Sequence, residues 1–248
     1  MSAAAFRDDL LQGRVALVSG GTSGIGAAIA DALAACGAAV TVSGATAEEA
    51  EAAKAHPRFR GKGAVALDVR DPAAIEALVA KQSRLDILIN AAGVIRRDAE
   101  HDPAVFAEVV DINLTGAMRL CTSARSLLAK SRGCIVNVTS MLAYFGGARV
   151  PGYSASKGGL GQLTKSLAIA YALDRIRVNA VAPGWIATRL TQALQDDNER
   201  SAAILARTPL GRWGVPEDIA GAVVFLCSPA ADFITGAVIP VDGGYLAA

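Results

Sequence analysis

Histidine, cysteine and aromatic residues are scarce in this sequence, and neither sign of charge dominates it. Among 248 residues there are two His and four Cys, and the formal net charge is +1. Neither His56 nor His101 has a partner at a metal-ligand spacing, and no two cysteines are spaced as a C-x-x-C pair. A metal site or a Ser-His-Asp hydrolase is therefore hard to build. The balanced charge also argues against nucleic acid and anionic membranes as partners.

Long apolar runs are missing as well. No uninterrupted apolar run reaches the length of about 18 residues that a membrane-spanning helix needs. The first residues are rich in alanine but carry Arg7, Asp8 and Asp9, unlike the apolar stretch of a signal peptide. We therefore expect a cytoplasmic protein, and we interpret the four cysteines as small buried hydrophobes in a reducing compartment.

Two kinds of apolar segment alternate along the chain. Short, almost continuously apolar runs are typical of parallel strands buried on both faces; they are 14–18, 39–43, 64–67, 85–90, 133–139, 176–181 and 237–241. Longer segments with helical period separate them; they are 24–36, 48–54, 73–81, 103–130, 153–173 and 216–226.

This alternation predicts an α/β fold, a doubly wound parallel sheet with helices on both faces. Nothing resembling a linker or a repeat divides the sequence, so we expect a single Rossmann-type domain over residues 1–248. Residues 184–214 are the least regular region and are interpreted as a substrate-side flap.

A glycine-rich turn joins the first strand to the first helix. The run Ser19-Gly-Gly-Thr-Ser-Gly-Ile-Gly26 follows the strand directly. Glycine permits positive φ angles and close approach of a ligand to the backbone. Free N–H groups at the helix start then suit a dinucleotide pyrophosphate. Gly20, Gly24 and Gly26 are the three glycines expected to form this turn.

The spacing Gly20-x-x-x-Gly24-x-Gly26 resembles that of the short-chain dehydrogenase/reductase family, and other marks of this family follow in order. Asn90-Ala-Ala-Gly93 resembles the family's Asn-Asn-Ala-Gly, with Ala91 in place of the second Asn, and Tyr153-Ser-Ala-Ser-Lys157 matches Tyr-x-x-x-Lys. Further matches are Asp68, Asn113, Ser140, Pro183, Gly184 and Thr188. The resemblance covers nearly the whole chain and implies a seven-stranded sheet and a homotetramer.

The resemblance also assigns residue roles. It implies that Asn113, Ser140, Tyr153 and Lys157 form the catalytic group, with Asp68 at the adenine ring. The residues expected to bind the cofactor are Gly20, Thr22, Ser23, Gly24, Ile25, Gly26, Gly44, Asp68, Val69, Asn90, Ala91, Gly93, Tyr153, Lys157, Pro183, Gly184, Ile186 and Thr188.

Tyr153 and Lys157 are four residues apart on a predicted helix and so share one face. A phenol with an ordinary pKa near 10 is a poor base at neutral pH, and a nearby ammonium lowers that pKa. We therefore expect Lys157 to lower the pKa of Tyr153, which would exchange a proton with the substrate hydroxyl or carbonyl. By the resemblance, Ser140 binds the substrate oxygen, Lys157 also holds the nicotinamide ribose, and Asn113 positions Lys157 through water.

The substrate is indicated by a narrower resemblance. The stretches Gly93–Arg97, 140–151 and 200–214 are similar to those of 2-dehydro-3-deoxy-D-gluconate 5-dehydrogenases and gluconate 5-dehydrogenases. A sugar acid needs a cation for its carboxylate, and Arg forms bidentate pairs well. We expect that at least one of Arg96, Arg149 and Arg189 binds a substrate carboxylate, beside Ser140 and Tyr153.

The choice between NAD and NADP rests on the end of the second strand, where an acidic residue favours NAD and a nearby Arg favours NADP. Gly44 and Ala45 occupy these positions and provide neither determinant. We favour NAD slightly, on the resemblance to the sugar-acid enzymes.

Two other functions remain open. A 3-oxoacyl carrier-protein reductase of the same family would use NADPH and present a basic surface, which the near-neutral charge does not favour. A non-catalytic nucleotide-sensing protein on the same fold typically lacks the Tyr or the Lys, and both are present here.

Overall fold

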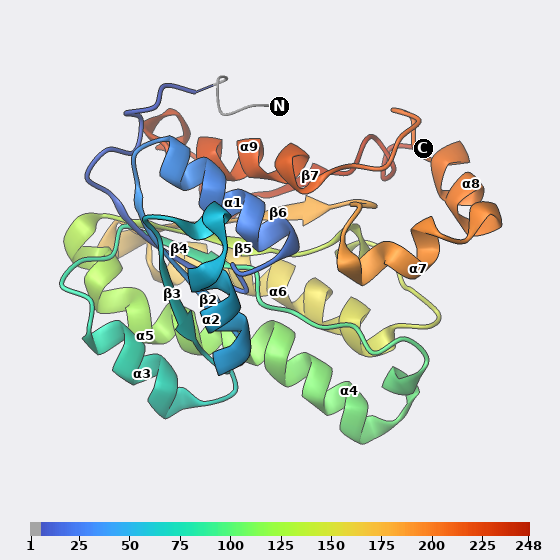
Figure 1. The fold of residues 1–248 in the computed structure, drawn as a ribbon, viewed down its shortest axis with the longest axis horizontal. Coiled ribbons are helices and arrows are strands. Elements are labelled where there is room, and N and C mark those ends of the chain that lie inside the picture. Colours follow the sequence, from blue (N-terminus) through green and yellow to red (C-terminus); the bar gives the residue numbers. More distant parts are fainter. Residues whose placement is uncertain (1–5) are drawn as a thin grey trace.

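The computed structural model describes residues 6–248, and its centre is one sheet of seven parallel strands (Figure 1). The strand order is β3-β2-β1-β4-β5-β6-β7. The strands are β1 (Val15–Ser19), β2 (Ala39–Gly44), β3 (Gly63–Ala66), β4 (Ile87–Asn90), β5 (Cys134–Val138), β6 (Arg177–Pro183) and β7 (Val238–Val241). The order reverses between β1 and β4, and ligands of such sheets bind beyond the carboxyl ends of the strands at this crevice.

Helices cover both faces of the sheet (Figure 1). They are α1 (Gly24–Ala35), α2 (Ala47–Ala55), α3 (Pro72–Ala80), α4 (Pro103–Val110), α5 (Gly116–Ser131), α6 (Pro151–Ala170), α7 (Gln192–Gln195), α8 (Asn198–Ala206) and α9 (Pro216–Cys227). One buried apolar cluster joins one face of the sheet to α1 and α9, and a second joins the other face to α3, α5 and α6. The predicted doubly wound, seven-stranded α/β fold is thereby confirmed.

Local sequence explains where several helices begin. Proline occupies the first turn of α3, α4, α6 and α9, where its missing N–H costs nothing. Asp71 and Asp102 precede two of these helices, and their carboxylates accept hydrogen bonds from backbone N–H groups of the first turn. The predicted strands and helices mostly end within two residues of the observed ones.

The predicted single helix over residues 103–130 is wrong in its middle. After α4, residues Asp111–Thr115 form a π-helical turn, η4, before α5 begins at Gly116. Such a turn inserts an extra residue into the helix and is frequent at functional sites. It contains Asn113, whose amide is hydrogen-bonded to a neighbouring segment and not exposed on a regular helix face.

Residues 184–214 are more regular than the sequence suggests. They include the short 3-10 helix η7 (Arg189–Thr191) as well as α7 and α8. Figure 1 shows α4, α7 and α8 on the same side of the molecule. The segment begins directly after β6, so it continues from the carboxyl end of that strand.

No helix within residues 6–248 combines the length and the apolar character needed to cross a bilayer. All four cysteines are buried and unpaired as disulfides, in agreement with their interpretation as small core residues.

Asp86 anchors the amino-terminal edge of the sheet, just before β4. Its side chain is fully buried and accepts hydrogen bonds from Val15 N (2.9 Å), Arg84 Nε (2.8 Å) and Arg14 Nη1 (3.2 Å). Burial alone would raise the pKa of Asp86, but these hydrogen bonds together hold the pKa below its usual range. The ionised form is therefore favoured by folding.

We expect Asp86→Asn to lower the free energy of unfolding at pH 7 by about 1–3 kcal/mol, because buried donors lose a charged acceptor. A carboxyl group with a lowered folded-state pKa contributes stability above its unfolded pKa of about 3.9. That contribution is lost as the pH falls through the folded-state value. Urea unfolding at several pH values should thus show the wild-type advantage shrinking below about pH 4.

The control is Glu76→Gln, which removes an exposed carboxylate of α3 and should change stability by less than about 0.5 kcal/mol. If the difference in the free energy of unfolding between wild type and Asp86→Asn did not depend on pH, this role of the ionised Asp86 carboxylate would be contradicted.

Candidate functional site

A cavity of about 1020 Å³ opens at the carboxyl ends of the central strands. It is large for a small-molecule site, since such pockets range over about 300–1,000 Å³. Every residue assigned to cofactor, substrate or catalysis from the sequence lines this cavity except Asn90 and Asn113. The fold thus brings together residues from Gly20 to Arg189 that are far apart in sequence.

The glycine-rich turn between β1 and α1 lines one part of the cavity. Gly20 has φ +65°, and a Cβ there would lie 2.7 Å from Ala92 Cα. A Cβ on Gly26 would lie 2.2 Å from the carbonyl oxygen of Gly20. Both positions require glycine, because any larger side chain would push the turn apart.

The helix that follows this turn starts without a side-chain cap. Ser23 is the N-cap residue of α1, and its hydroxyl makes no capping hydrogen bond. Residues 22–26 line the cavity, so unpaired N–H groups and the positive end of the helix dipole face it. This arrangement fits the pyrophosphate of a dinucleotide.

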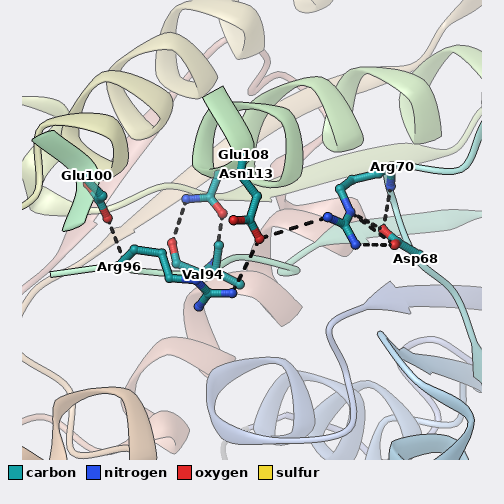
Figure 2. Close-up of polar contacts among 7 residues, drawn as sticks. All are labelled: Asp68, Arg70, Val94, Arg96, Glu100, Glu108 and Asn113. Carbon is teal, nitrogen blue, oxygen red and sulfur yellow. Dashed lines mark hydrogen bonds and ion pairs between the residues drawn. The ribbon is translucent and has the colours of Figure 1, made fainter. Parts of the chain in front are cut away.

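Asn113 lies beneath the cavity wall and is 1% exposed. Its Oδ1 accepts from Val94 N at 2.8 Å, and its Nδ2 donates to Val94 O at 3.0 Å and Ser156 Oγ at 3.1 Å (Figure 2). A Cβ on Gly93 would lie 3.3 Å from Asn113 Oδ1 and 3.4 Å from Lys157 Nζ. The amide therefore fixes the segment after β4 close to the lysine.

Asn90 faces the core and not the cavity. It is 3% exposed, and its Nδ2 donates to Asn137 Oδ1 at 2.8 Å and to Cys121 Sγ at 3.3 Å. Asn137 Nδ2 in turn donates to Thr164 Oγ1 at 2.9 Å. This buried polar chain ties β4 to β5 and α6, so the side chain of Asn90 acts within the scaffold.

Tyr153, Ser140 and Lys157 line the same cavity. Burial raises the pKa of Tyr153 to about 12, while the hydrogen bond with Ser140 acts in the opposite direction. Burial lowers the pKa of Lys157 to about 8. Lys157 Nζ donates to Val138 O at 2.8 Å and lies 5.5 Å from the centre of the Tyr153 ring.

The expected lowering of the Tyr153 pKa by Lys157 is therefore wrong, because the pKa is raised. The lysine is directed at a backbone carbonyl, and burial penalises the phenolate more than the neighbouring charges favour it. Burial therefore disfavours the phenolate form of Tyr153.

A chain of ion pairs follows one wall of the cavity (Figure 2). Arg70 pairs with Asp68 (Nη2 to Oδ2, 2.7 Å) and approaches Glu108 at 4.0 Å, and Arg96 lies 3.6 Å from the same Glu108 carboxylate oxygen. The hydrogen bond from Arg70 holds the pKa of Asp68 below its usual range, against the effect of burial. Asp68 therefore borders the cavity as a carboxylate whose charge is already balanced by Arg70.

The three arginines selected from the sequence differ in their partners. Arg96 pairs with Glu108, and Arg149 pairs with Asp98. Arg189 forms no ion pair with another described residue. The sequence analysis missed Arg97, which also lines the cavity without an ion pair to any residue in 6–248. The positive charge of Arg97 acts to lower the pKa of Tyr153, so its guanidinium lies within electrostatic reach of the phenol.

Glu49 is a second cavity residue that the sequence analysis missed. It lies in the first turn of α2, and its Oε2 accepts from Ala45 N at 2.7 Å. A Cβ on Gly44 would lie 2.8 Å from this same Oε2. Because Gly44 lacks a side chain, the Glu49 carboxylate occupies the position where a side chain at the end of β2 would begin.

Comparison with known proteins finds matches over almost the whole chain. A family model described as Enoyl-(Acyl carrier protein) reductase matches residues 20–246. A 2-dehydro-3-deoxy-D-gluconate 5-dehydrogenase of Pseudoalteromonas atlantica is 42% identical over 246 residues, covering 95% of this chain and 97% of the relative.

The chain belongs to the short-chain dehydrogenase/reductase family. A second relative, the 3-oxoacyl-[acyl-carrier-protein] reductase of Vibrio cholerae, is 40% identical, with 94% of this chain and 98% of the relative covered. The crystal structure of a gluconate 5-dehydrogenase from Burkholderia cenocepacia, in complex with NADP and tartrate, matches with a TM-score of 0.90 and 34% identity, covering 97% and 98% of the two chains. This short-chain dehydrogenase/reductase is an NAD(P)-dependent oxidoreductase.

We expect Gly26→Ala to weaken binding of reduced nicotinamide cofactor by at least about tenfold, because the added methyl overlaps the Gly20 carbonyl. Fluorescence titration of NADH measures this affinity. Gly221→Ala in α9 is the matched control, since a Cβ there meets nothing within 4 Å. Equal affinities of the two variants would rule out the turn as the pyrophosphate site.

Proposed function

We propose that this enzyme transfers a hydride between NAD and a secondary hydroxyl or ketone of a sugar acid of the ketodeoxygluconate or gluconate type. The observation that carries the proposal is a pair of arginines, Arg97 and Arg189, that line the cavity with Tyr153 and Ser140 and form no ion pair within residues 6–248. An unpaired guanidinium at a cavity wall is ready to bind a carboxylate. The names of the Pseudoalteromonas and Burkholderia relatives support the same substrate class.

The bound nicotinamide supplies the hydride acceptor or donor and, when oxidised, a positive charge that favours a nearby phenolate. Tyr153 takes the proton from the substrate hydroxyl during oxidation and returns it to the carbonyl oxygen during reduction. Ser140 hydrogen-bonds the same oxygen and keeps it beside the phenol. Both groups line the same cavity, which places them within reach of one bound substrate.

Lys157 and Asn113 support this proton transfer. The Lys157 ammonium donates to Val138 O and lies 5.5 Å from the centre of the Tyr153 ring. We assign it to the nicotinamide ribose hydroxyls, where it also favours the ionised phenol. Asn113 keeps Gly93 and Val94 in place next to this ammonium.

The preference for NAD rests on Glu49. Its carboxylate fills the place of the acidic residue that ends the second strand in many NAD enzymes, where it would accept a hydrogen bond from the adenosine ribose. A 2′-phosphate at this position would meet a like charge. The Burkholderia relative binds NADP, so this preference is proposed for the present chain on its own residues.

A 3-oxoacyl carrier-protein reductase is the second candidate, favoured by the Vibrio relative and by the description of the family model. An acyl thioester has no carboxylate at its reacting end, and the unpaired arginines would then face an acidic carrier at the cavity mouth. We place the sugar acid first because Arg97 acts electrostatically on Tyr153 itself. We further propose a single-domain, cytoplasmic homotetramer in which residues 184–214 form a flap over the substrate.

An absorbance assay of nicotinamide reduction should show turnover with aldonates or ketodeoxy sugar acids and none with simple alcohols. We expect Arg97→Ala and Arg189→Ala to raise the Michaelis constant for the sugar acid by about 10- to 100-fold, the value of one charge-assisted contact. Arg96→Ala and Arg149→Ala should have smaller effects, because Glu108 and Asp98 already balance those charges.

Turnover confined to a 3-oxoacyl thioester with NADPH would favour the second candidate. An unchanged Michaelis constant for the sugar acid in all four arginine variants would remove the carboxylate site altogether.

Glu49→Gln should reduce the preference for NAD over NADP by about tenfold or more, because the amide keeps the contact to Ala45 N but removes the repulsive charge. The ratio of kcat/KM for the two cofactors is the measurement. Glu48→Gln is the control, since Glu48 lies on the same helical turn outside the cavity lining. A wild-type enzyme that strongly prefers NADP, or a ratio that Glu49→Gln leaves unchanged, would contradict this role.

A further inference from the structure

Glu100 is a buried acidic residue for which the proposed reaction has no role so far. It lies in the short 3-10 helix η3 (Ala99–His101), in the segment between β4 and α4, and is 1% exposed. Carboxylates are rarely fully buried unless they are paired. This one accepts two hydrogen bonds from backbone N–H groups of two different segments.

The two donors belong to the walls of the cavity. Oε1 accepts from Arg96 N at 2.8 Å (Figure 2), and Oε2 accepts from Tyr153 N at 2.8 Å. Glu100 N also donates to Arg96 O at 3.0 Å, which closes a tight turn around Arg97. One carboxylate therefore joins the segment that carries Arg97 to the first turn of the helix that carries Tyr153.

The first turn of α6 cannot cap itself. Its N-cap residue is Val150, whose side chain has no acceptor, and its first residue is Pro151. The Tyr153 N–H would otherwise be one of the unpaired donors of a helix start. Glu100 supplies the missing acceptor from 53 residues away, and its charge lies at the positive end of the helix dipole.

Gly152 makes this approach possible. A Cβ at this position would lie 3.3 Å from Glu100 Oε2 and 3.3 Å from Phe106 Cδ2. The carboxylate is thus enclosed between the start of α6 and the side of α4. In such a low-dielectric position its charge acts strongly on nearby groups.

We propose that Glu100 is a positioning residue for the proton-transfer step: its buried carboxylate caps α6 from outside the helix, fixes where the Tyr153 ring points, and sets the pH range in which Tyr153 works. This inference rests on the proposed role of Tyr153 as the proton donor and acceptor. The charge of Glu100 acts to raise the pKa of Tyr153, beside the larger effect of burial. This supports an effect of Glu100 on the pH range of the reaction.

Several other charged groups lie near Tyr153 or line the same cavity. Arg97 acts to lower the pKa of Tyr153, and Lys157 lies below its ring. Arg149, paired with Asp98, precedes α6, and Arg189 and Arg200 of the 184–214 segment line the same cavity. Of these groups, only Glu100 is hydrogen-bonded to the backbone of Tyr153.

The test compares Glu100→Gln, which keeps the size and removes the charge, with Glu100→Asp, which keeps the charge on a shorter side chain. In the oxidation direction we expect activity to rise with pH as Tyr153 ionises. Removing the negative charge favours the phenolate, so in Glu100→Gln this rise should move to lower pH by about half a unit or more. We expect kcat to fall about tenfold with the Michaelis constant for the cofactor unchanged, because a misplaced acid–base group slows only the chemical step.

Glu100→Asp should lower kcat but keep the wild-type pH profile. Glu76→Gln, an exposed charge change on α3, should alter neither quantity. Wild-type kcat and pH profile in Glu100→Gln would overturn the proposal, and so would a loss of kcat with an unmoved pH profile, which indicates a purely structural cap.

If Glu100→Gln does not fold, Gly152→Ala is the second variant, since its methyl crowds the carboxylate without changing the charge. A severalfold loss of kcat supports the proposal, and unchanged kcat overturns it. Tyr153→Phe distinguishes a failure of the proposed role of Tyr153 from a failure of the role of Glu100. If it retains full turnover, the proposed function of Tyr153 fails; if it is inactive while Glu100→Gln is unaffected, only the role of Glu100 fails.

Discussion

Two hydrogen bonds between the amide of Asn113 and the backbone of Val94 determine where the wall of the cavity lies. The side-chain amide of Asn113 pairs with both the N–H and the C=O of Val94, as a neighbouring β-strand would. The backbone just after the end of β4 is thereby held in place. Asn113 lies in the π-helical turn between α4 and α5, a feature that is frequent at functional sites. Gly93 and Arg97 belong to the segment that follows β4, and Gly93 lies next to the ammonium of Lys157.

Burial has the largest effect on the pKa values of Tyr153 and Lys157. It moves the pKa of Tyr153 up and that of Lys157 down, so both groups favour their neutral forms compared with water. Within residues 6–248, four of the arginines that line the cavity pair with a carboxylate, and Arg97 and Arg189 do not. The charge available to a ligand therefore depends on which arginines lack partners, and not on how many arginines line the site.

Two carboxylates show how an acceptor can come from a different part of the chain than expected. Glu49 reaches the end of β2 from α2 because Gly44 leaves the space open, and Glu100 caps α6 because Val150 cannot. In each case an absent side chain at the usual position is compensated by a residue several or many positions away. Both carboxylates accept a backbone N–H, so their positions are fixed before any ligand binds.

The sequence alone determined the α/β alternation, the glycine turn and the four-residue spacing of Tyr153 and Lys157, because these depend on residues that are close in sequence. Hydrophobic period and turn chemistry are local properties, and they were sufficient for the strand and helix order. Only the tertiary structure decided the break at Asn113, the inward direction of Asn90, the raised pKa of Tyr153 and the difference between paired and unpaired arginines. Each of these depends on burial or on a partner distant in sequence, such as the 53 residues between Glu100 and Tyr153, and no local pattern encodes such a distance.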